Sequence, residues 1–247
     1  MKVEVAPSGP EMARRAAAYA AETIRSALAS RGEARIIVAT GASQFGFLEA
    51  LTAAQDVAWG QVIGFHLDEY VGLPATHPAS FRRYLRTRFL GALPEPLKAF
   101  HEVNGEAADL AQECRRLQAL LDAGPVDLAC VGIGENGHLA FNDPPADFET
   151  EDAYLVVRLD EACRRQQVGE GWFATLGDVP RLALSMSIRQ IMKSRRIVCT
   201  VPDERKAAAV RNAVKGPISN SCPASILQKH PECMLVLDPA AASRLDG

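Results

Sequence analysis

The 247-residue sequence lacks a strong charge of either sign and lacks any long apolar run. Its 27 Lys and Arg residues nearly balance 30 Asp and Glu residues, which leaves a formal net charge of -3. Binding to a nucleic-acid backbone or to an anionic membrane surface requires a basic field, so we expect no nucleic acid and no membrane as a partner. No segment approaches the ~20 consecutive apolar residues that span a bilayer. The expected partner is a small molecule.

Cysteine is scarce and irregularly placed. The six cysteines form no C-x-x-C pair and follow no regular spacing. Because zinc sites and disulfide frameworks both show such regularities, we expect neither a metal nor disulfide bonds. Residues 1–20 mix charged with apolar side chains and so lack the uninterrupted apolar stretch of a secretory signal. We therefore expect the protein to reside in the reducing cytoplasm.

The composition is that of a chain that folds around a hydrophobic core. Hydrophobic residues make up 48% and charged residues 23% of the sequence, close to the globular average. A single core stops growing only near ~250–300 residues, so this length suits one large domain. We accordingly treat residues 1–247 as a single domain.

Short apolar strands alternate with amphipathic helices along the chain. We expect strands at 35–40, 61–67, 126–131, 154–159, 183–187, 195–201 and 233–237, and helices at 11–30, 45–54, 78–90, 107–122 and 204–215. This alternation predicts an α/β fold with a single doubly wound, mostly parallel, Rossmann-like sheet and helices on both faces. Ligands of such sheets bind beyond the carboxyl ends of the strands.

A glycine-rich stretch follows one of these strands and matches a dinucleotide fingerprint. Gly132-Ile-Gly-Glu-Asn-Gly137 has the G-x-G-x-x-G pattern. That fingerprint needs a helix opening at its third glycine, yet Pro144 and Pro145 follow closely and proline is not tolerated inside a helix. We therefore expect no dinucleotide cofactor. The loop is predicted instead to bring backbone amides near a small ligand.

The same loop carries a histidine and an aspartate five residues apart. His138 lies directly after Gly137, and imidazole is the side chain that titrates near neutral pH without perturbation. Asp143 could hold the ring and raise its basicity, as carboxylates do for many catalytic histidines. The alternative is that Asp143 is a turn residue before a proline. The spacing leaves both interpretations of Asp143 open.

Two adjacent carboxylates, Asp68 and Glu69, follow the strand at 61–67. Neighbouring side chains of an extended segment point to opposite sides, so at most one of them faces a given ligand. A partly buried carboxylate beside a glycine-rich loop suits a general base that removes a proton next to a carbonyl carbon. The alternative is a structural ion pair with an arginine of the segment 81–88.

A turn with two hydroxyl groups and a glycine links a predicted strand to a predicted helix. Thr40, Gly41, Ala42 and Ser43 could hold a phosphate against the free N–H groups of the helix start. No G-K-[ST] sequence follows, so the turn is no Walker loop. Lys206 begins a later helix and could supply a cation at the same edge. The alternatives are a helix-capping role for Ser43 and a solvated surface position for Lys206.

Two segments together resemble the glucosamine-6-phosphate deaminase (isomerase) family. The segments are Phe65-His-Leu-Asp-Glu-Tyr-Val-Gly-Leu73 and Gly132-Ile-Gly-Glu-Asn-Gly-His-Leu-Ala-Phe-Asn-Asp-Pro144. The resemblance continues through residues 40–41, 179–180, 206–207 and 221–231. The related 6-phosphogluconolactonases share the fold and typically have Asp-Glu-Arg where this chain has Asp-Glu-Tyr at 68–70. This difference favours the deaminase branch.

The resemblance implies a reaction that needs no cofactor. Glucosamine 6-phosphate and water would become fructose 6-phosphate and ammonia, with His138 opening the sugar ring and Asp68 moving a proton between C2 and C1. The turn at 40–43 and Lys206 would hold the phosphate. Another sugar-phosphate isomerase, a lactonase and a non-catalytic sugar-phosphate sensor are the alternatives. A homo-oligomer is also left open.

Several residues depart from the usual pattern of this family. The histidine loop commonly reads Asp-Gly-His with a glutamate five residues later, whereas this chain has Asn136-Gly137-His138 and Asp143. The family also places a phosphate-binding arginine after the loop, and Arg164 is the candidate here, with Arg165 second. The chain stops soon after its last predicted strand, so we expect no C-terminal regulatory extension.

Overall fold

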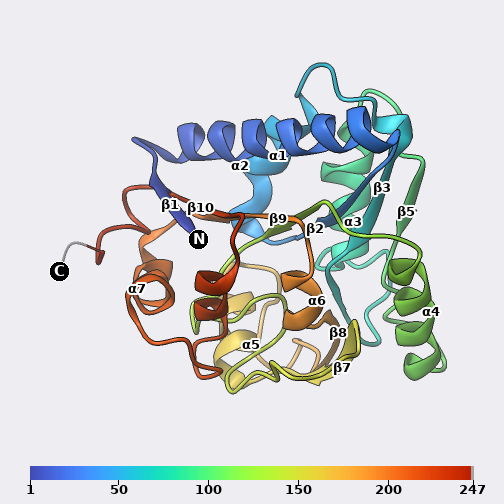
Figure 1. Ribbon diagram of the computed structural model, residues 1–247. Helices are drawn as coiled ribbons and strands as arrows, with labels where there is room; N and C mark the ends of the chain where they lie inside the picture. The colour runs from blue at the N-terminus through green and yellow to red at the C-terminus, as the bar shows by residue number, and fades with distance from the viewer. Residues whose placement is uncertain (246–247) are drawn as a thin grey trace.

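A seven-stranded parallel sheet organises the computed structural model, which describes residues 1–245 (Figure 1). In spatial order the strands are β1 (Lys2–Val5), β10 (Cys233–Leu237), β9 (Arg196–Val201), β6 (Leu128–Val131), β2 (Ala34–Val38), β3 (Val62–His66) and β5 (Ala99–His101). Each neighbouring pair is parallel. The predicted doubly wound, mostly parallel sheet is therefore confirmed, and β1 and β5 extend it at its two edges.

Helices cover both faces of this sheet (Figure 1). The α-helices of the described residues are α1 (Gly9–Arg31), α2 (Phe45–Thr52), α3 (Phe81–Arg88), α4 (Leu110–Asp122), α5 (Glu161–Gly169), α6 (Ile188–Met192) and α7 (Ala207–Lys215). The first two lie over one face, and α4, α6 and α7 lie on the opposite side. The helices α5 and α6 were not expected from the sequence. Within the described residues, no helix is both long and apolar enough to cross a bilayer.

Alternate residues of the central strand pack into two separate cores. In β2, Ile36 and Val38 belong to the hydrophobic cluster under α1 and α2. Ile37 lies between them in sequence and belongs to the cluster on the opposite face, which contains residues of α4 and α7. Side chains of a strand point alternately to its two faces, and a strand covered on both faces is mostly apolar. All five residues of β2 are buried, and Arg35 is the one polar residue among them.

The chain order reverses between β2 and β6. From β2 the chain proceeds outward to β3 and then β5, and it later returns to β6 on the other side of β2. Neighbouring crossovers that leave in opposite directions open a crevice at the carboxyl ends of such strands. The loops that follow β2 and β6 are the loops predicted to hold phosphate and to carry His138.

A small antiparallel sheet lies beyond the end of β3. It contains β4 (Asp68–Tyr70), β8 (Leu182–Met186) and β7 (Tyr154–Arg158), in the order β4-β8-β7. The predicted strands near 154–159 and 183–187 both exist, but they pair with β4 and stay outside the parallel sheet. This second sheet was not predicted, because strand pairing between distant segments leaves no periodic signal in a sequence. It fixes the backbone on both sides of Asp68.

One glycine lets a loop pack directly on β4. The N–H of Gly72 donates to the carbonyl oxygen of Gly105 at 2.8 Å. A Cβ atom at position 105 would lie 2.0 Å from the carbonyl oxygen of Tyr70, which is main chain and has little freedom to move. A side chain at position 105 must therefore displace β4 or the loop.

We expect Gly105→Ala to lower the free energy of unfolding by about 1–3 kcal/mol, the usual cost of overpacking. Gly9→Ala is the matched control, because no heavy atom lies within 4 Å of a Cβ placed there. The control should be neutral or slightly stabilising. Urea denaturation of the three proteins measures the difference, and equal midpoints for Gly105→Ala and the parent would contradict the expectation.

Candidate active site

An open cleft of about 530 Å³ lies at the carboxyl ends of the central strands. It brings together four of the segments that the sequence singled out, represented by Thr40, Asp68, Gly134, His138 and Lys206. Ligand sites of open α/β sheets occur at such crevices. The cleft is therefore the candidate site of the protein.

The structure separates the two adjacent carboxylates Asp68 and Glu69. Glu69 is fully buried and points to the first turn of α3, where its oxygens accept from the N–H groups of Phe81 and Arg82 and from the hydroxyl of Ser80. The guanidinium Nε of Arg82 also lies 3.3 Å from it. The ion pair foreseen for one of the two acids thus belongs to Glu69. Asp68 lines the cleft.

Asp68 is a buried carboxylate with an unpartnered oxygen. Its residue is 5% exposed, and Oδ1 has no hydrogen-bond partner. Burial raises the pKa of Asp68 well above its ordinary 3.8, and the neighbouring charge of Glu69 raises it further. A carboxylate in such surroundings binds a proton more readily than one in water. This property suits a group that takes a proton from a ligand and returns it.

The histidine loop folds back on itself so that the His138 ring rests on Gly134. The N–H of Gly134 donates to the carbonyl oxygen of His138 at 3.0 Å. A Cβ atom at position 134 would lie 2.2 Å from two atoms of the imidazole. The third loop glycine, Gly137, adopts φ +86°, a left-handed conformation that glycine takes without strain. Gly134 and Gly137 therefore both contribute to placing the His138 ring.

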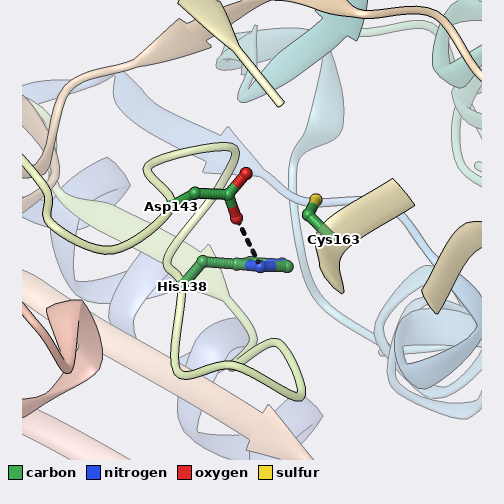
Figure 2. A group of neighbouring side chains, drawn as sticks. All are labelled: His138, Asp143 and Cys163. Atoms are coloured by element: carbon green, nitrogen blue, oxygen red, sulfur yellow. Dashed lines mark ion pairs between the residues drawn. The ribbon is translucent and has the colours of Figure 1, made fainter. Parts of the chain in front are cut away.

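His138 lines the cleft and faces Asp143 (Figure 2). Nδ1 of the ring lies 3.2 Å from Oδ1 of Asp143. The ring is seen edge-on in Figure 2, with the carboxylate above its plane, and the contact does not meet hydrogen-bond geometry. Burial raises the pKa of Asp143, but the histidine and other polar contacts outweigh burial and the pKa falls below its ordinary value. The pairing considered for Asp143 is thus present as a close contact.

Asn136 connects Asp143 with a second carboxylate. Its Nδ2 donates to Oδ1 of Asp143 at 3.0 Å and to Oδ2 of Asp160 at 3.1 Å. The N–H of Asp160 donates to Oδ2 of Asp143 at 2.9 Å. Its own Oδ1 caps α5 by accepting from the N–H of Cys163. An amide at position 136 therefore supplies the donor that these two carboxylates require, which a carboxylate there could not do.

One group of side chains near this loop has metal-ligand chemistry. His138, Asp143 and Cys163 each offer one ligand atom, and these atoms lie within 4.8 Å of one another. Figure 2 shows the Cys163 sulfur beside the carboxylate. Burial raises the pKa of this thiol well above its ordinary value of 9.0, and both Asp143 oxygens already accept hydrogen bonds. A metal would have to displace these donors and remove the thiol proton, so the group fits a metal poorly.

The turn after β2 forms another wall of the cleft. Thr40, Gly41 and Ser43 line it, whereas Ala42 does not. The carbonyl oxygen of Gly41 accepts from the hydroxyl of Tyr84 at 2.9 Å. The buried Gln44 anchors the turn from below, because its Oε1 accepts from the hydroxyl of Thr200 at 2.9 Å. The turn is thus fixed by contacts to two other elements before any ligand binds.

Lys206 reaches the cleft from the start of α7 and is almost completely buried. Its side chain is 4% exposed, and Nζ lies 3.5 Å from Oε1 of Glu170, whose side chain is 6% exposed. Burial lowers the pKa of Lys206, and Glu170 partly opposes this effect. Sequence reasoning identified Lys206 and missed Glu170. The missed signal was helical spacing, since Cys163, Gln166, Gln167 and Glu170 lie on one face of α5 and of the turn that ends it.

Arg164 does not line the cleft. Its guanidinium donates to the carbonyl oxygens of Leu176 and Val179, and thereby fixes the segment after α5. Arg165 is exposed and pairs with Glu161 on the helix surface. The sequence placed both arginines near the site, but the helical repeat turns them away from the face that carries Gln166 and Gln167. The structure therefore does not bring Arg164 to the candidate phosphate turn.

Known proteins resemble this chain over nearly its whole length. The family model described as glucosamine-6-phosphate isomerases/6-phosphogluconolactonase matches residues 7–235. A glucosamine-6-phosphate deaminase of Rhodopirellula baltica is 38% identical over 252 residues, covering 100% of this chain and 96% of that protein. Another, from Streptococcus agalactiae, is 38% identical over 210 residues, covering 84% of this chain and 86% of that protein.

Solved structures extend this similarity to the fold. A monomeric glucosamine-6-phosphate deaminase superposes with a TM-score of 0.90 at 33% identity, covering 98% of this chain and 99% of that one. The 6-phosphogluconolactonase of Trypanosoma brucei superposes with a TM-score of 0.79 at 16% identity, covering 99% and 98% of the two chains. The second similarity shows a shared fold.

We expect Gly134→Ala to expel the His138 ring from its position, because the new methyl group would occupy the space of the imidazole. A crystal structure of the variant should show Nδ1 of His138 beyond hydrogen-bond distance from Asp143. Gly177→Ala is the matched control, since a Cβ there makes only an ordinary 3.5 Å contact with Thr175. An unmoved imidazole in the Gly134→Ala structure would contradict the expectation.

We expect Asp68→Asn to stabilise the protein at neutral pH by at least about 1 kcal/mol, because it removes a buried charge with an unpartnered oxygen. The raised pKa means that the folded state holds the Asp68 proton more tightly than the unfolded chain does. The parent therefore loses stability as pH rises above 3.8 and through the folded-state pKa, and the variant lacks this loss. Urea denaturation of both proteins from acid to neutral pH measures this loss of stability. Parallel curves of unfolding free energy against pH for the parent and Asp68→Asn would contradict the expectation.

Proposed function

Because the chain belongs to the family of glucosamine-6-phosphate isomerases and 6-phosphogluconolactonases, we propose that it converts glucosamine 6-phosphate and water into fructose 6-phosphate and ammonia. The observation that carries this proposal is the pair of Asp68 and His138 in one cleft, a proton acceptor with a raised pKa and an imidazole beside a carboxylate. Relatives at 38% identity are glucosamine-6-phosphate deaminases, which supports the same reaction.

His138 serves the first step of the proposed reaction. It gives a proton to the ring oxygen as the C1–O bond breaks and the 1-hydroxyl loses its proton, which leaves an open-chain aldehyde. Asp143 lies 3.2 Å from Nδ1 and stabilises the protonated ring before the transfer. Asn136 holds that carboxylate from its other side. These three residues therefore act as one unit in ring opening.

Asp68 serves the proton transfer that follows. It removes the proton from C2 while O1 takes a proton from water, which yields an enolamine, and it then returns its proton to C1. The resulting C2 iminium adds water and releases ammonia, so that C2 becomes the ketone of fructose 6-phosphate. A general base with a pKa near the working pH is most effective, and burial moves Asp68 in that direction. Each such proton transfer contributes about 10²–10⁴-fold in rate.

The phosphate is proposed to bind between the turn at 40–43 and Lys206. Thr40 and Ser43 supply hydroxyls, Gly41 supplies backbone, and Lys206 supplies the charge. Gly137 supplies the left-handed turn just before His138. We further propose one catalytic domain, residues 1–247, acting in the cytoplasm. Its six cysteines, none of them in a disulfide bond, are compatible with that compartment.

A lactonase is the second candidate, because solved 6-phosphogluconolactonases share the fold. The residue at position 70 argues against a lactonase. Lactonases typically have arginine there, whereas Tyr70 is fully buried here and its hydroxyl donates to Oε1 of Gln167 at 2.7 Å. Its ring packs against Phe81, Phe141 and Phe173. The position is thus filled by an aromatic cluster without a charge.

Purified protein should release ammonia and fructose 6-phosphate from glucosamine 6-phosphate in a coupled assay. We expect Asp68→Asn and His138→Gln each to lower kcat by about 10²–10⁴-fold, because each removes one proton-transfer group. Lys206→Met should act mainly on KM, because it removes a phosphate contact.

Arg164→Gln is the matched control for the same assay, since its guanidinium contacts only backbone outside the cleft. It should keep kcat and KM within a few-fold of the parent if the protein stays folded. Folded protein that hydrolyses 6-phosphogluconolactone without releasing ammonia from the aminosugar would establish the lactonase. Folded protein inactive on both substrates would refute both candidates.

A further inference from the structure

The cleft wall carries more carboxylates than cationic side chains, which disfavours an anionic ligand. Among the described residues that line the cleft, Lys206 is the only lysine or arginine, and the carboxylates of Asp68 and Glu170 line the same cleft. Lys206 is moreover already paired with Glu170. A phosphate dianion that approaches Lys206 therefore meets a nearby negative charge.

Glu170 is held in place by three donors. Its Oε1 accepts from Nε2 of Gln166 at 2.8 Å, and its Oε2 accepts from Nε1 of Trp172 at 3.1 Å. Lys206 lies 3.5 Å from Oε1, a longer and weaker contact. The carboxylate keeps its position through Gln166 and Trp172 even when Lys206 turns to a ligand. Glu170 therefore stays in the cleft wall when an anion binds.

A carboxylate in this position favours a ligand that donates a hydrogen bond to it. An ionised carboxylate only accepts hydrogen bonds, and each oxygen can accept more than one. A buried acceptor left facing another acceptor is strongly unfavourable. A phosphate monoanion meets the requirement, because its P–OH donates to Glu170 while its other oxygens accept from Lys206. A dianion can also accept from Lys206, but it has no proton to donate to Glu170 and is repelled by that carboxylate.

We propose that Glu170 is a specificity-determining residue that selects a protonated phosphate, the monoanion of the sugar phosphate, over dianions. The proposal rests on the proposed function only in placing the phosphate at Lys206. The second pKa of a phosphate ester is about 6. Binding should therefore weaken as pH rises above that value, by about tenfold for each pH unit, because the monoanion becomes scarce. Sulfate, a dianion without a proton to donate, should bind poorly.

A purely structural role for Glu170 has a different consequence. If Glu170 served only as a counterion for the buried Lys206, its loss would change folding and the affinity for all anions alike. The selectivity between phosphate and sulfate, two tetrahedral anions of similar size, would then not change when Glu170 is replaced. The ratio of phosphate to sulfate affinity therefore separates a selecting carboxylate from a counterion.

The test is calorimetric binding of inorganic phosphate and of sulfate to the full chain at about pH 6 and about pH 8. The parent should prefer phosphate by about tenfold or more at the lower pH and lose much of this preference at the higher pH. Glu170→Gln can donate through its amide, so it should bind sulfate nearly as well as phosphate. Glu161→Gln is the matched control, because that carboxylate is exposed on the same helix and pairs with Arg165.

Three results would overturn the proposal: equal affinities of the parent for the two anions, unchanged selectivity in folded Glu170→Gln, or no binding of either anion. The parent comparison requires no variant, so a Glu170→Gln protein that fails to fold does not remove the test. The assay involves no turnover. Anion selectivity without ammonia release would therefore retain this proposal and refute the proposed function. Ammonia release without anion selectivity would retain the proposed function and refute this proposal.

Discussion

The hydrogen bonds that Glu69 accepts decide how the rest of the site is arranged. This fully buried carboxylate closes the first turn of α3, where backbone N–H groups, the hydroxyl of Ser80 and the guanidinium of Arg82 all donate to it. Side chains alternate along β4, so fixing Glu69 toward α3 turns Asp68 toward the cleft. Glu69, whose hydrogen bonds are satisfied, therefore holds Asp68 in a position where Oδ1 of Asp68 has no partner. A fully hydrogen-bonded carboxylate and a carboxylate with an unpartnered oxygen therefore come from the same three-residue strand.

The cleft combines few charges with strong burial, and this combination explains its chemistry. Asp68, Lys206 and Glu170 are each almost inaccessible to solvent. Burial disfavours the charged forms of Asp68 and Lys206, so the pKa of the aspartate rises and that of the lysine falls. An anionic ligand must offset the free-energy cost of these buried charges with well-matched hydrogen-bond donors and acceptors. Selectivity in such a site depends on hydrogen-bond matching more than on net charge.

Helix α5 links the parts of the site that differ from the usual family pattern. Asp160 caps the helix and receives Asn136, which in turn holds Asp143. The far end of the same helix leads into Glu170. The replacement of carboxylate by amide at position 136 is thus matched by a carboxylate at position 160. Residues that look like separate departures in the sequence form one connected network.

The sequence by itself determined the alternating strands and helices, the parallel sheet and the loops at its carboxyl edge. Apolar strands and amphipathic helices are local patterns, and the carboxyl ends of parallel strands must meet at one edge. Asp68, His138 and Lys206 were identified in this way. Only the tertiary structure decided which of Asp68 and Glu69 faces the cleft, that Arg164 points away, and that Glu170 meets Lys206. These outcomes depend on side-chain direction and on pairing between segments distant in the chain, such as β4 with β8. No local pattern encodes a contact of that kind.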